Sequence, residues 1–145
     1  MKVTKKDLSL NNGIQKEWII TNGIGGYSSS TIVGVNTRKY HGLLVAPLTP
    51  PARRMVILSK VDESVFIEDK RYDIFSNMGK GFVSSGYVYQ EAFEKEYIPT
   101  FTYKVNNDIT ITKSICMQYG KNTVCVLYRI ENSRSRSEDF HYTTS

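Results

Sequence analysis

The most regular pattern of hydrophobic and polar positions lies between residues 101 and 130. Apolar side chains recur at 101, 103 and 105, at 109, 111, 115 and 117, and at 124, 126, 128 and 130, and mostly polar side chains lie between them. An Asn-Asn-Asp run at 106–108 and a Gly-Lys pair at 120–121 separate the three runs with residues that favour turns. A period of two with turns between the runs predicts three consecutive antiparallel strands.

The turn lengths also predict the register of these strands. A three-residue turn at 106–108 places Tyr103 opposite Ile111, and a two-residue turn at 120–121 places Ile111 opposite Ile130. One apolar face then crosses all three strands, whereas a slip of one residue would break that face. The same register places Cys116 opposite Cys125, where a disulfide is geometrically conceivable.

The rest of the chain predicts further strands and no amphipathic helix of ten or more residues. One antiparallel, all-β sandwich, similar to a supersandwich, is the fold we expect for residues 13–145, after a polar lead-in over residues 1–12 that contains one short edge strand. The expected elements are short strands at 18–21, 31–35 and 43–46, a strand at 54–61, a hairpin of 64–67 with 71–75, a Gly- and Ser-rich loop at 76–86, and a polar tail at 131–139.

Composition and charge exclude several classes of protein. A chain of 145 residues suits one domain. Its formal charge is +5, but the basic residues form no continuous stripe with interleaved aromatics, so we expect no nucleic-acid partner. No run of about 18 apolar residues predicts a membrane span, and the basic N-terminus lacks the apolar stretch of a secretory signal. Two cysteines without an export signal indicate the reducing cytoplasm and favour free thiols. His41 and His141 lack ligand-like spacing to the cysteines, so we expect no metal, and nothing indicates a cofactor.

A glycine-rich loop joins the expected strands at 18–21 and 31–35. Gly23, Gly25 and Gly26 can take positive φ without a Cβ penalty, and Asn22 can bond its own backbone. Such a loop allows close approach of the backbone to a ligand, or it makes a tight structural turn. A phosphate cradle is a weaker third interpretation, because a β-rich Ser/Thr run without a lysine follows, in place of a helix or a Walker-type Lys-Ser/Thr pair.

A second loop, residues 38–42, is basic and aromatic. Arg38, Lys39, Tyr40 and His41 offer a guanidinium, an ammonium, a phenol and an imidazole, which bind hydroxyls and carboxylates well. The alternative is a solvated basic turn in which Arg38 pairs with a surface carboxylate and Tyr40 packs in the core.

Adjacent carboxylates at Asp62 and Glu63 invite an acid–base interpretation. Neighbours on a strand point to opposite faces, whereas the two carboxylates of a glycosidase face one sugar from about 5 to 9.5 Å apart. We therefore interpret Asp62 and Glu63 as polar residues at a strand end.

Two motifs carry a resemblance to a known family. Residues 22–27 read Asn-Gly-Ile-Gly-Gly-Tyr, and residues 37–45 read Thr-Arg-Lys-Tyr-His-Gly-Leu-Leu-Val. Together they resemble the signature of the N-terminal domain of bacterial and archaeal glycogen-debranching enzymes of the amylo-α-1,6-glucosidase type. Further matches, in order, are Pro50-Pro51 with Arg53 or Arg54, Leu-Ser-Lys-Val-Asp-Glu at 58–63, and Asn-Thr-Val-Cys-Val at 122–126 leading to Tyr128. The resemblance covers roughly residues 13 to 130.

The resemblance implies a β-sandwich that precedes an (α/α)-barrel catalytic domain, which hydrolyses α-1,6 branch points and has no counterpart here. The chain would then be a non-catalytic domain of a glycogen-degrading enzyme, with α-glucan and the catalytic domain as partners and no catalytic residue of its own. The alternatives are a stand-alone α-glucan-binding module and a purely structural module. Substrate binding or contact with the catalytic domain is assigned to Asn22, Gly25, Gly26, Tyr27, Arg38, Tyr40 and His41.

Overall fold

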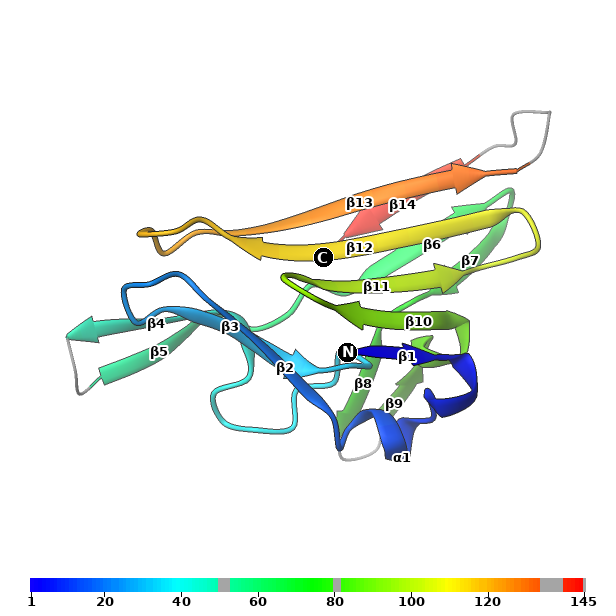
Figure 1. Cartoon of the computed structure of the whole chain (residues 1–145). Helices are drawn as coiled ribbons and strands as arrows, with labels where there is room; N and C mark the ends of the chain where they lie inside the picture. Colours follow the sequence, from blue (N-terminus) through cyan, green and yellow to red (C-terminus); the bar gives the residue numbers. More distant parts are fainter. Residues whose placement is uncertain (50–52, 80–81, 134–139, 145) are drawn as a thin grey trace.

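The computed structural model describes residues 1–49, 53–79, 82–133 and 140–144. The chain is an all-β sandwich of antiparallel sheets, as predicted (Figure 1). The strands are β1 (Lys2–Thr4), β2 (Glu17–Thr21), β3 (Tyr27–Thr31), β4 (Gly42–Thr49), β5 (Arg53–Leu58), β6 (Glu63–Ile67), β7 (Lys70–Asp73), β8 (Ser76–Gly79), β9 (Phe82–Ser85), β10 (Gln90–Lys95), β11 (Pro99–Lys104), β12 (Ile109–Met117), β13 (Val124–Asn132) and β14 (Phe140–Thr144). Among the described residues, the helical elements are short: η1 (Lys5–Asp7), α1 (Leu10–Gly13) and η2 (Gly86–Tyr89).

The largest sheet has the order β1-β10-β11-β12-β13 and contains the predicted three-stranded meander. Tyr103 pairs with Ile111, and Ile111 pairs with Ile130, so the predicted register is confirmed. The side chain of Asn106 shapes the first turn, because its Oδ1 accepts hydrogen bonds from the backbone N–H groups of Asp108 and Ile109, each at 2.8 Å. The expected N-terminal edge strand is also present, since β1 pairs with β10.

Three smaller sheets complete the fold, with the orders β2-β3-β4-β5, β14-β6-β7 and β8-β9. The predicted hairpin of 64–67 with 71–75 is confirmed as β6 and β7. Two predictions are wrong. The second strand spans Tyr27–Thr31, and residues 32–35 turn away from it, whereas we expected a strand at 31–35. The region 76–86, predicted as a loop, contains the hairpin β8–β9.

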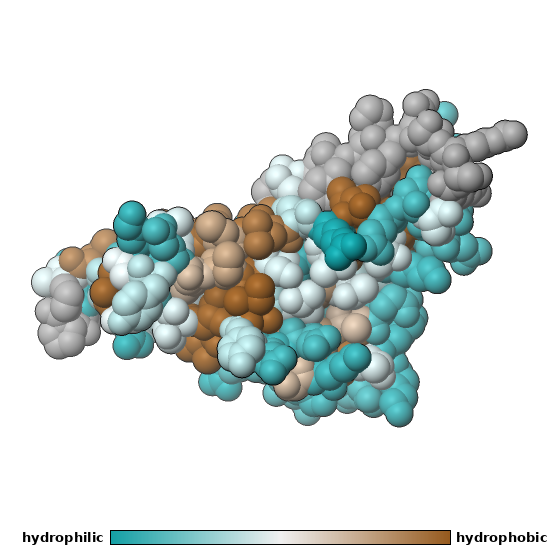
Figure 2. Space-filling view, turned by 45° about the horizontal axis from the view of Figure 1, so that its top comes forward, coloured by the Kyte–Doolittle hydropathy of each residue, from teal (hydrophilic) through white to brown (hydrophobic). Residues whose placement is uncertain are grey.

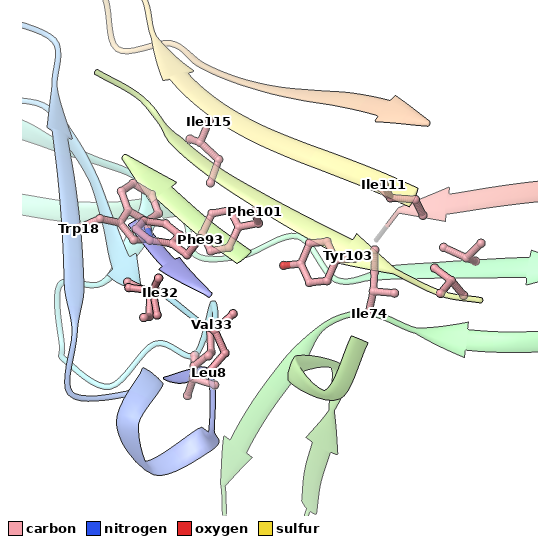
Figure 3. Packing of buried hydrophobic residues seen from close by; sticks show 14 of the residues in the cluster. Leu8, Trp18, Ile32, Val33, Ile74, Phe93, Phe101, Tyr103, Ile111 and Ile115 are labelled. Atoms are coloured by element: carbon pink, nitrogen blue, oxygen red, sulfur yellow. The ribbon is translucent and has the colours of Figure 1, made fainter. Parts of the chain in front are cut away.

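The core lies between the five-stranded sheet and the strands that face it (Figure 3). Phe93 and Phe101, on neighbouring strands, meet edge to face at 5.0 Å, and the Trp18 ring from β2 meets Phe101 at 6.3 Å. Ile111 and Ile115 continue the same buried face along β12. Because β2 points Trp18 into this core, alternate residues of β2 face outward and are available for another role.

Candidate functional site

A groove of about 780 Å³ lies on the outer face of the β2-β3-β4-β5 sheet. On β2, Trp18 is buried and its Nε1–H donates to the Thr31 carbonyl at 3.1 Å, whereas Glu17, Ile19 and Thr21 face the groove. Because strand residues rise about 3.3 Å each, Glu17 and Thr21 are about 13 Å apart along the floor. The groove is lined by Glu17, Ile19, Thr21, Gly23, Gly25, Gly26, Tyr27, Ser29, Arg38, Lys39, Tyr40, His41 and Arg54.

The glycine-rich loop between β2 and β3 forms one end of the groove, and Asn22 organises it. The Oδ1 atom of Asn22 accepts hydrogen bonds from the backbone N–H groups of Ile24 (3.1 Å) and Gly26 (3.0 Å). Gly23 and Gly25 have φ of 83° and 93°, a region that other residues rarely adopt. The predicted self-bonding of Asn22 and the positive φ values of Gly23 and Gly25 are therefore confirmed, whereas Gly26 does not take a positive φ.

The tip of the β12–β13 hairpin, which belongs to the five-stranded sheet, is hydrogen-bonded to this loop. The N–H of Gly120 donates to the Asn22 carbonyl at 2.7 Å, while Asn22 Nδ2 donates to the Lys121 carbonyl at 2.9 Å and to Asn122 Oδ1 at 2.8 Å. Segments about 100 residues apart in the sequence thus share one polar centre, and both tips lie at the left of Figure 1. Asn22 is fully buried beneath the loop, so its role in this structure is to shape the groove wall.

A carboxylate between two basic side chains forms the other end of the groove. Glu17 Oε1 pairs with Arg38 Nε and lies 3.5 Å from His41 Nε2. Arg38 is largely exposed, whereas the ring of His41 is buried. The expected alternative, in which Arg38 pairs with a surface carboxylate, is therefore also met, because Arg38 pairs with Glu17. That carboxylate lines the groove.

The hydrogen bonds of His41 define its protonation state. Its Nδ1 accepts from the backbone N–H groups of Thr37 (2.9 Å) and Arg38 (3.3 Å), so this nitrogen carries no proton. Burial lowers the pKa of His41, Arg38 lowers it further, and Glu17 raises it. The imidazole is thus neutral with its proton on Nε2, an atom that has no hydrogen-bond partner among the described residues and faces Glu17.

Two tyrosines form the aromatic part of the groove. The Tyr27 hydroxyl donates to the Tyr40 carbonyl at 3.2 Å, which joins the two predicted loops. Arg54 lies over the Tyr27 ring at 5.7 Å, and Lys39 lies over the Tyr40 ring at 5.3 Å. Tyr40 is 40% exposed, so it lies at the surface and is not packed in the core.

The structure thus gathers six of the seven predicted site residues on one groove, with Asn22 beneath them. Glu17 and Arg54 also line the groove, and the sequence analysis missed both as site residues. The alternation of β2 could have indicated Glu17, because Trp18 and Ile20 mark the inward face and leave Glu17 on the other.

Asp62 and Glu63 lie away from this groove. Glu63 begins β6, as expected for a strand-end residue, but it is only 1% exposed, and this burial was not predicted. It pairs with the buried Lys113 and accepts a hydrogen bond of 2.7 Å from the Tyr128 hydroxyl. Asp62 lies 3.1 Å from Lys60, whose pKa is lowered by burial in spite of that carboxylate.

The model of the family described as glycogen debranching enzyme N terminal matches residues 16–140. The chain belongs to this family. No curated protein and no solved structure matches it significantly.

The motifs of this debranching-enzyme N-terminal domain meet in space. The run 22–27 contributes Asn22 and the run 122–126 contributes Asn122, and these two side chains are hydrogen-bonded. Glu63, from the run 58–63, accepts a hydrogen bond from Tyr128, which follows the run 122–126. Pro50-Pro51 lies outside the described residues.

The described residues contain neither a cluster of three or more potential metal ligands nor a helix long and apolar enough to cross a membrane. Cys116 pairs with Cys125 across β12 and β13, as predicted, and both are free thiols. Burial raises the pKa of the Cys116 thiol, and Cys125 beside it raises it further.

Proposed function

We propose that this domain supports the catalytic domain of a glycogen-debranching enzyme and that its groove borders the α-glucan cleft of that enzyme. The observation that carries the proposal is the meeting of the two sequence motifs on one groove, through the hydrogen bond from the Tyr27 hydroxyl to the Tyr40 carbonyl. A groove on the outer face of a sheet can face a second domain while the inner face fills the core.

The groups in the groove match the chemistry of sugar hydroxyls. The carboxylate of Glu17 accepts hydrogen bonds, and the exposed guanidinium of Arg38 donates them. The rings of Tyr27 and Tyr40 add flat apolar surface for the faces of a pyranose. The floor from Glu17 to Thr21 is about 13 Å long, which suits a chain of sugars better than a compact ion.

The groove does not supply the chemistry of hydrolysis in this proposal. Glycoside hydrolysis uses two opposed carboxyl groups. Glu17 is the one carboxylate among the described residues that line the groove. We therefore expect the 145-residue chain to release no glucose from a branched limit dextrin, with the acid and the base supplied by the catalytic domain.

The cytoplasm is the compartment we propose, because reducing conditions keep pairs such as Cys116 and Cys125 as free thiols. Two other roles remain as outcomes of the test. A stand-alone α-glucan-binding module would bind glucan but support no catalytic domain, and a purely structural module would bind none.

The test is the substitution Arg38→Ala in the polypeptide that joins this domain to its catalytic domain. Arg38 is exposed, and an exposed ion pair stabilises a fold by about 0–1 kcal/mol, so the melting temperature is expected to change little. We expect the activity on branched glucan to fall about tenfold or more, since one directed contact to a charged group contributes roughly 1.5–3 kcal/mol. His41→Ala is a poorer test, because it also removes the acceptor for two backbone N–H groups.

Arg129→Ala is the matched control. Arg129 is as exposed as Arg38 and pairs with Glu131 at 2.9 Å, but it lies on β13 and not on the groove. We expect this variant to keep the wild-type activity. Unchanged kinetics in Arg38→Ala, or an equal loss in Arg129→Ala, would show that the groove has no part in glucan processing.

A further inference from the structure

Tyr119, at the tip of the β12–β13 hairpin, is the aromatic side chain with the largest exposed fraction among the described residues, at 86%. A bulky ring in solvent gives up the free energy that its burial would provide, so an exposed ring beside a groove calls for an explanation. The apolar surface of this half of the molecule, where β2–β5 and the hairpin tip lie, is visible at the left of Figure 2, whereas the right half is more hydrophilic.

The ring of Tyr119 lies against the glycine-rich loop of the groove. A Cβ atom added to Gly23 would come within 2.5 Å of Tyr119 Cε2, so the ring packs directly on bare backbone. Gly23 itself lines the groove. Glycine at position 23 therefore has two physical reasons, its φ of 83° and the close approach of Tyr119.

The backbone that carries Tyr119 is fixed to the groove. The next residue, Gly120, donates its N–H to the Asn22 carbonyl, and the following residue, Lys121, accepts from Asn22 Nδ2. A ring held on such a turn loses little conformational entropy when a ligand covers it. Exposure and fixed placement together are the properties of a preorganised contact.

Tyr119 differs in its surroundings from the tyrosines inside the groove. The rings of Tyr27 and Tyr40 each have a cation over one face, Arg54 and Lys39 respectively. In the part of the chain that the structure describes, no cation lies over the Tyr119 ring. Its outer face is therefore open to a neutral, flat partner.

We propose that Tyr119 forms an aromatic subsite at the glycine end of the groove, so that the groove binds a linear stretch of α-linked glucosyl units between Tyr119 and Glu17. The span from Glu17 to Thr21 alone is about 13 Å at the rise of a strand, which exceeds one pyranose ring, and Gly23 extends it further. This inference rests on the proposed function. It adds the length of the bound glucan and a residue, Tyr119, whose contact depends on that length.

The experiment is calorimetric titration of the 145-residue chain with maltoheptaose and with maltotriose. Tyr119→Ala is expected to weaken maltoheptaose binding about tenfold, because it removes a stacking surface, and to weaken maltotriose binding less. Tyr119→Phe keeps the ring and is expected to bind as the wild type does. Tyr119→Leu keeps an apolar contact with Gly23 but lacks a flat face, so it is expected to bind as weakly as Tyr119→Ala.

Tyr97→Ala is the matched control, since Tyr97 is 81% exposed and lies in the loop between β10 and β11, outside the groove. It is expected to bind both sugars as the wild type does. Wild-type affinity in Tyr119→Ala, or an equal loss in Tyr97→Ala, would overturn the subsite while leaving the proposed function in place. No binding by the wild-type chain would overturn the subsite too, and it would point to Tyr119 as a contact for the catalytic domain. Failure of the proposed function itself is read separately, from Arg38→Ala in the joined enzyme.

Discussion

Asn22 and Glu63 are both polar and both fully buried, but they hold together different parts of the molecule. Asn22 is a neutral amide whose hydrogen bonds run to the glycine-rich loop and to the β12–β13 tip. Glu63 is a carboxylate on β6 that pairs with Lys113 on β12 and Tyr128 on β13. It lines a small pocket of about 30 Å³, whereas Asn22 lies beneath a larger, open groove.

The difference shows how one hairpin can serve two purposes. The middle of β12–β13 provides partners for a buried charge that joins the two layers of the sandwich. The tip of the same hairpin provides partners for an amide that can donate and accept at once, which lets it join two loops without any charge. We therefore expect substitutions at Glu63 to change mainly stability, and substitutions at Asn22 to change both stability and ligand binding.

Glu63→Gln tests the buried charge and has the largest expected effect. The variant leaves Lys113, which is 8% exposed, without its counter-charge, and breaking a buried pair in this way costs about 3–5 kcal/mol. Urea unfolding measures the loss. Glu131→Gln, which breaks the exposed pair with Arg129, is the control and is expected to cost at most about 1 kcal/mol. Equal losses in the two variants would contradict the role given to Glu63.

Asn22→Ala tests the amide and comes next. It removes the acceptor for the N–H groups of Ile24 and Gly26, and it leaves the Lys121 carbonyl without its donor. Stranding such groups costs about 1–3 kcal/mol, and we expect the groove to lose its shape and its affinity for maltoheptaose. Asn22→Asp keeps the acceptor but not the donor, so it is expected to fall between Asn22→Ala and the wild type. A variant that is destabilised but binds normally would separate Asn22 from the groove.

Gly26→Ala tests how closely the residues around Asn22 are packed. A Cβ atom there would lie 2.4 Å from Asn22 Nδ2 and 2.7 Å from Asn122 Oδ1, and overpacking of this kind costs about 1–3 kcal/mol. Gly34→Ala is the control, because φ of 78° strains an alanine there by about 1–2 kcal/mol although nothing lies within 4 Å. Calorimetric unfolding gives both values, and only Gly26→Ala is expected to lower sugar affinity as well.

The sequence predicted the meander with its register, because apolar residues recur at nearly every second position and the turns contain Asn, Asp and Gly. It failed at β3, whose Ser-Ser-Ser-Thr run has no apolar period. Those residues are buried because their hydroxyls find backbone acceptors: Ser29 Oγ donates to the Trp18 carbonyl at 2.8 Å, and Thr31 Oγ1 to the Val35 carbonyl at 2.8 Å. Burial by hydrogen bonding leaves no hydrophobic pattern to detect.

The candidate site shows the same division. Arg38, Tyr40 and His41 could be chosen from the sequence because they are adjacent in one loop. Asn122 and Tyr119 could not be linked to Asn22 and Gly23, since contacts across about 100 residues depend on the docking of the hairpin tip on the loop. Local chemistry was therefore predictable, and the long-range partners that fix it were not.

The smallest expected effect is a pH dependence of stability from His41, the buried polar group at the other end of the groove. Burial lowers its pKa in the folded chain below 6.5, the ordinary value that we expect in the unfolded chain. As the pH falls below 6.5, the unfolded chain binds a proton before the folded chain does. The contribution of His41 to the free energy of unfolding is therefore complete above pH 6.5 and is lost as the pH falls through the lower, folded pKa.

Urea unfolding of the wild type and of His41→Gln from pH 7.5 to pH 5 measures this contribution. The wild type is expected to lose more stability over this range than His41→Gln, because only the wild type must protonate an imidazole whose Nδ1 already accepts two backbone hydrogen bonds. His141 is present in both chains, so its titration cancels in the difference. Glu17→Gln sharpens the test, since Glu17 raises the pKa of His41 and its removal moves the folded pKa still lower. That variant is expected to show the steepest loss below pH 6.5, and parallel curves for all three proteins would show that folding does not shift the pKa of His41.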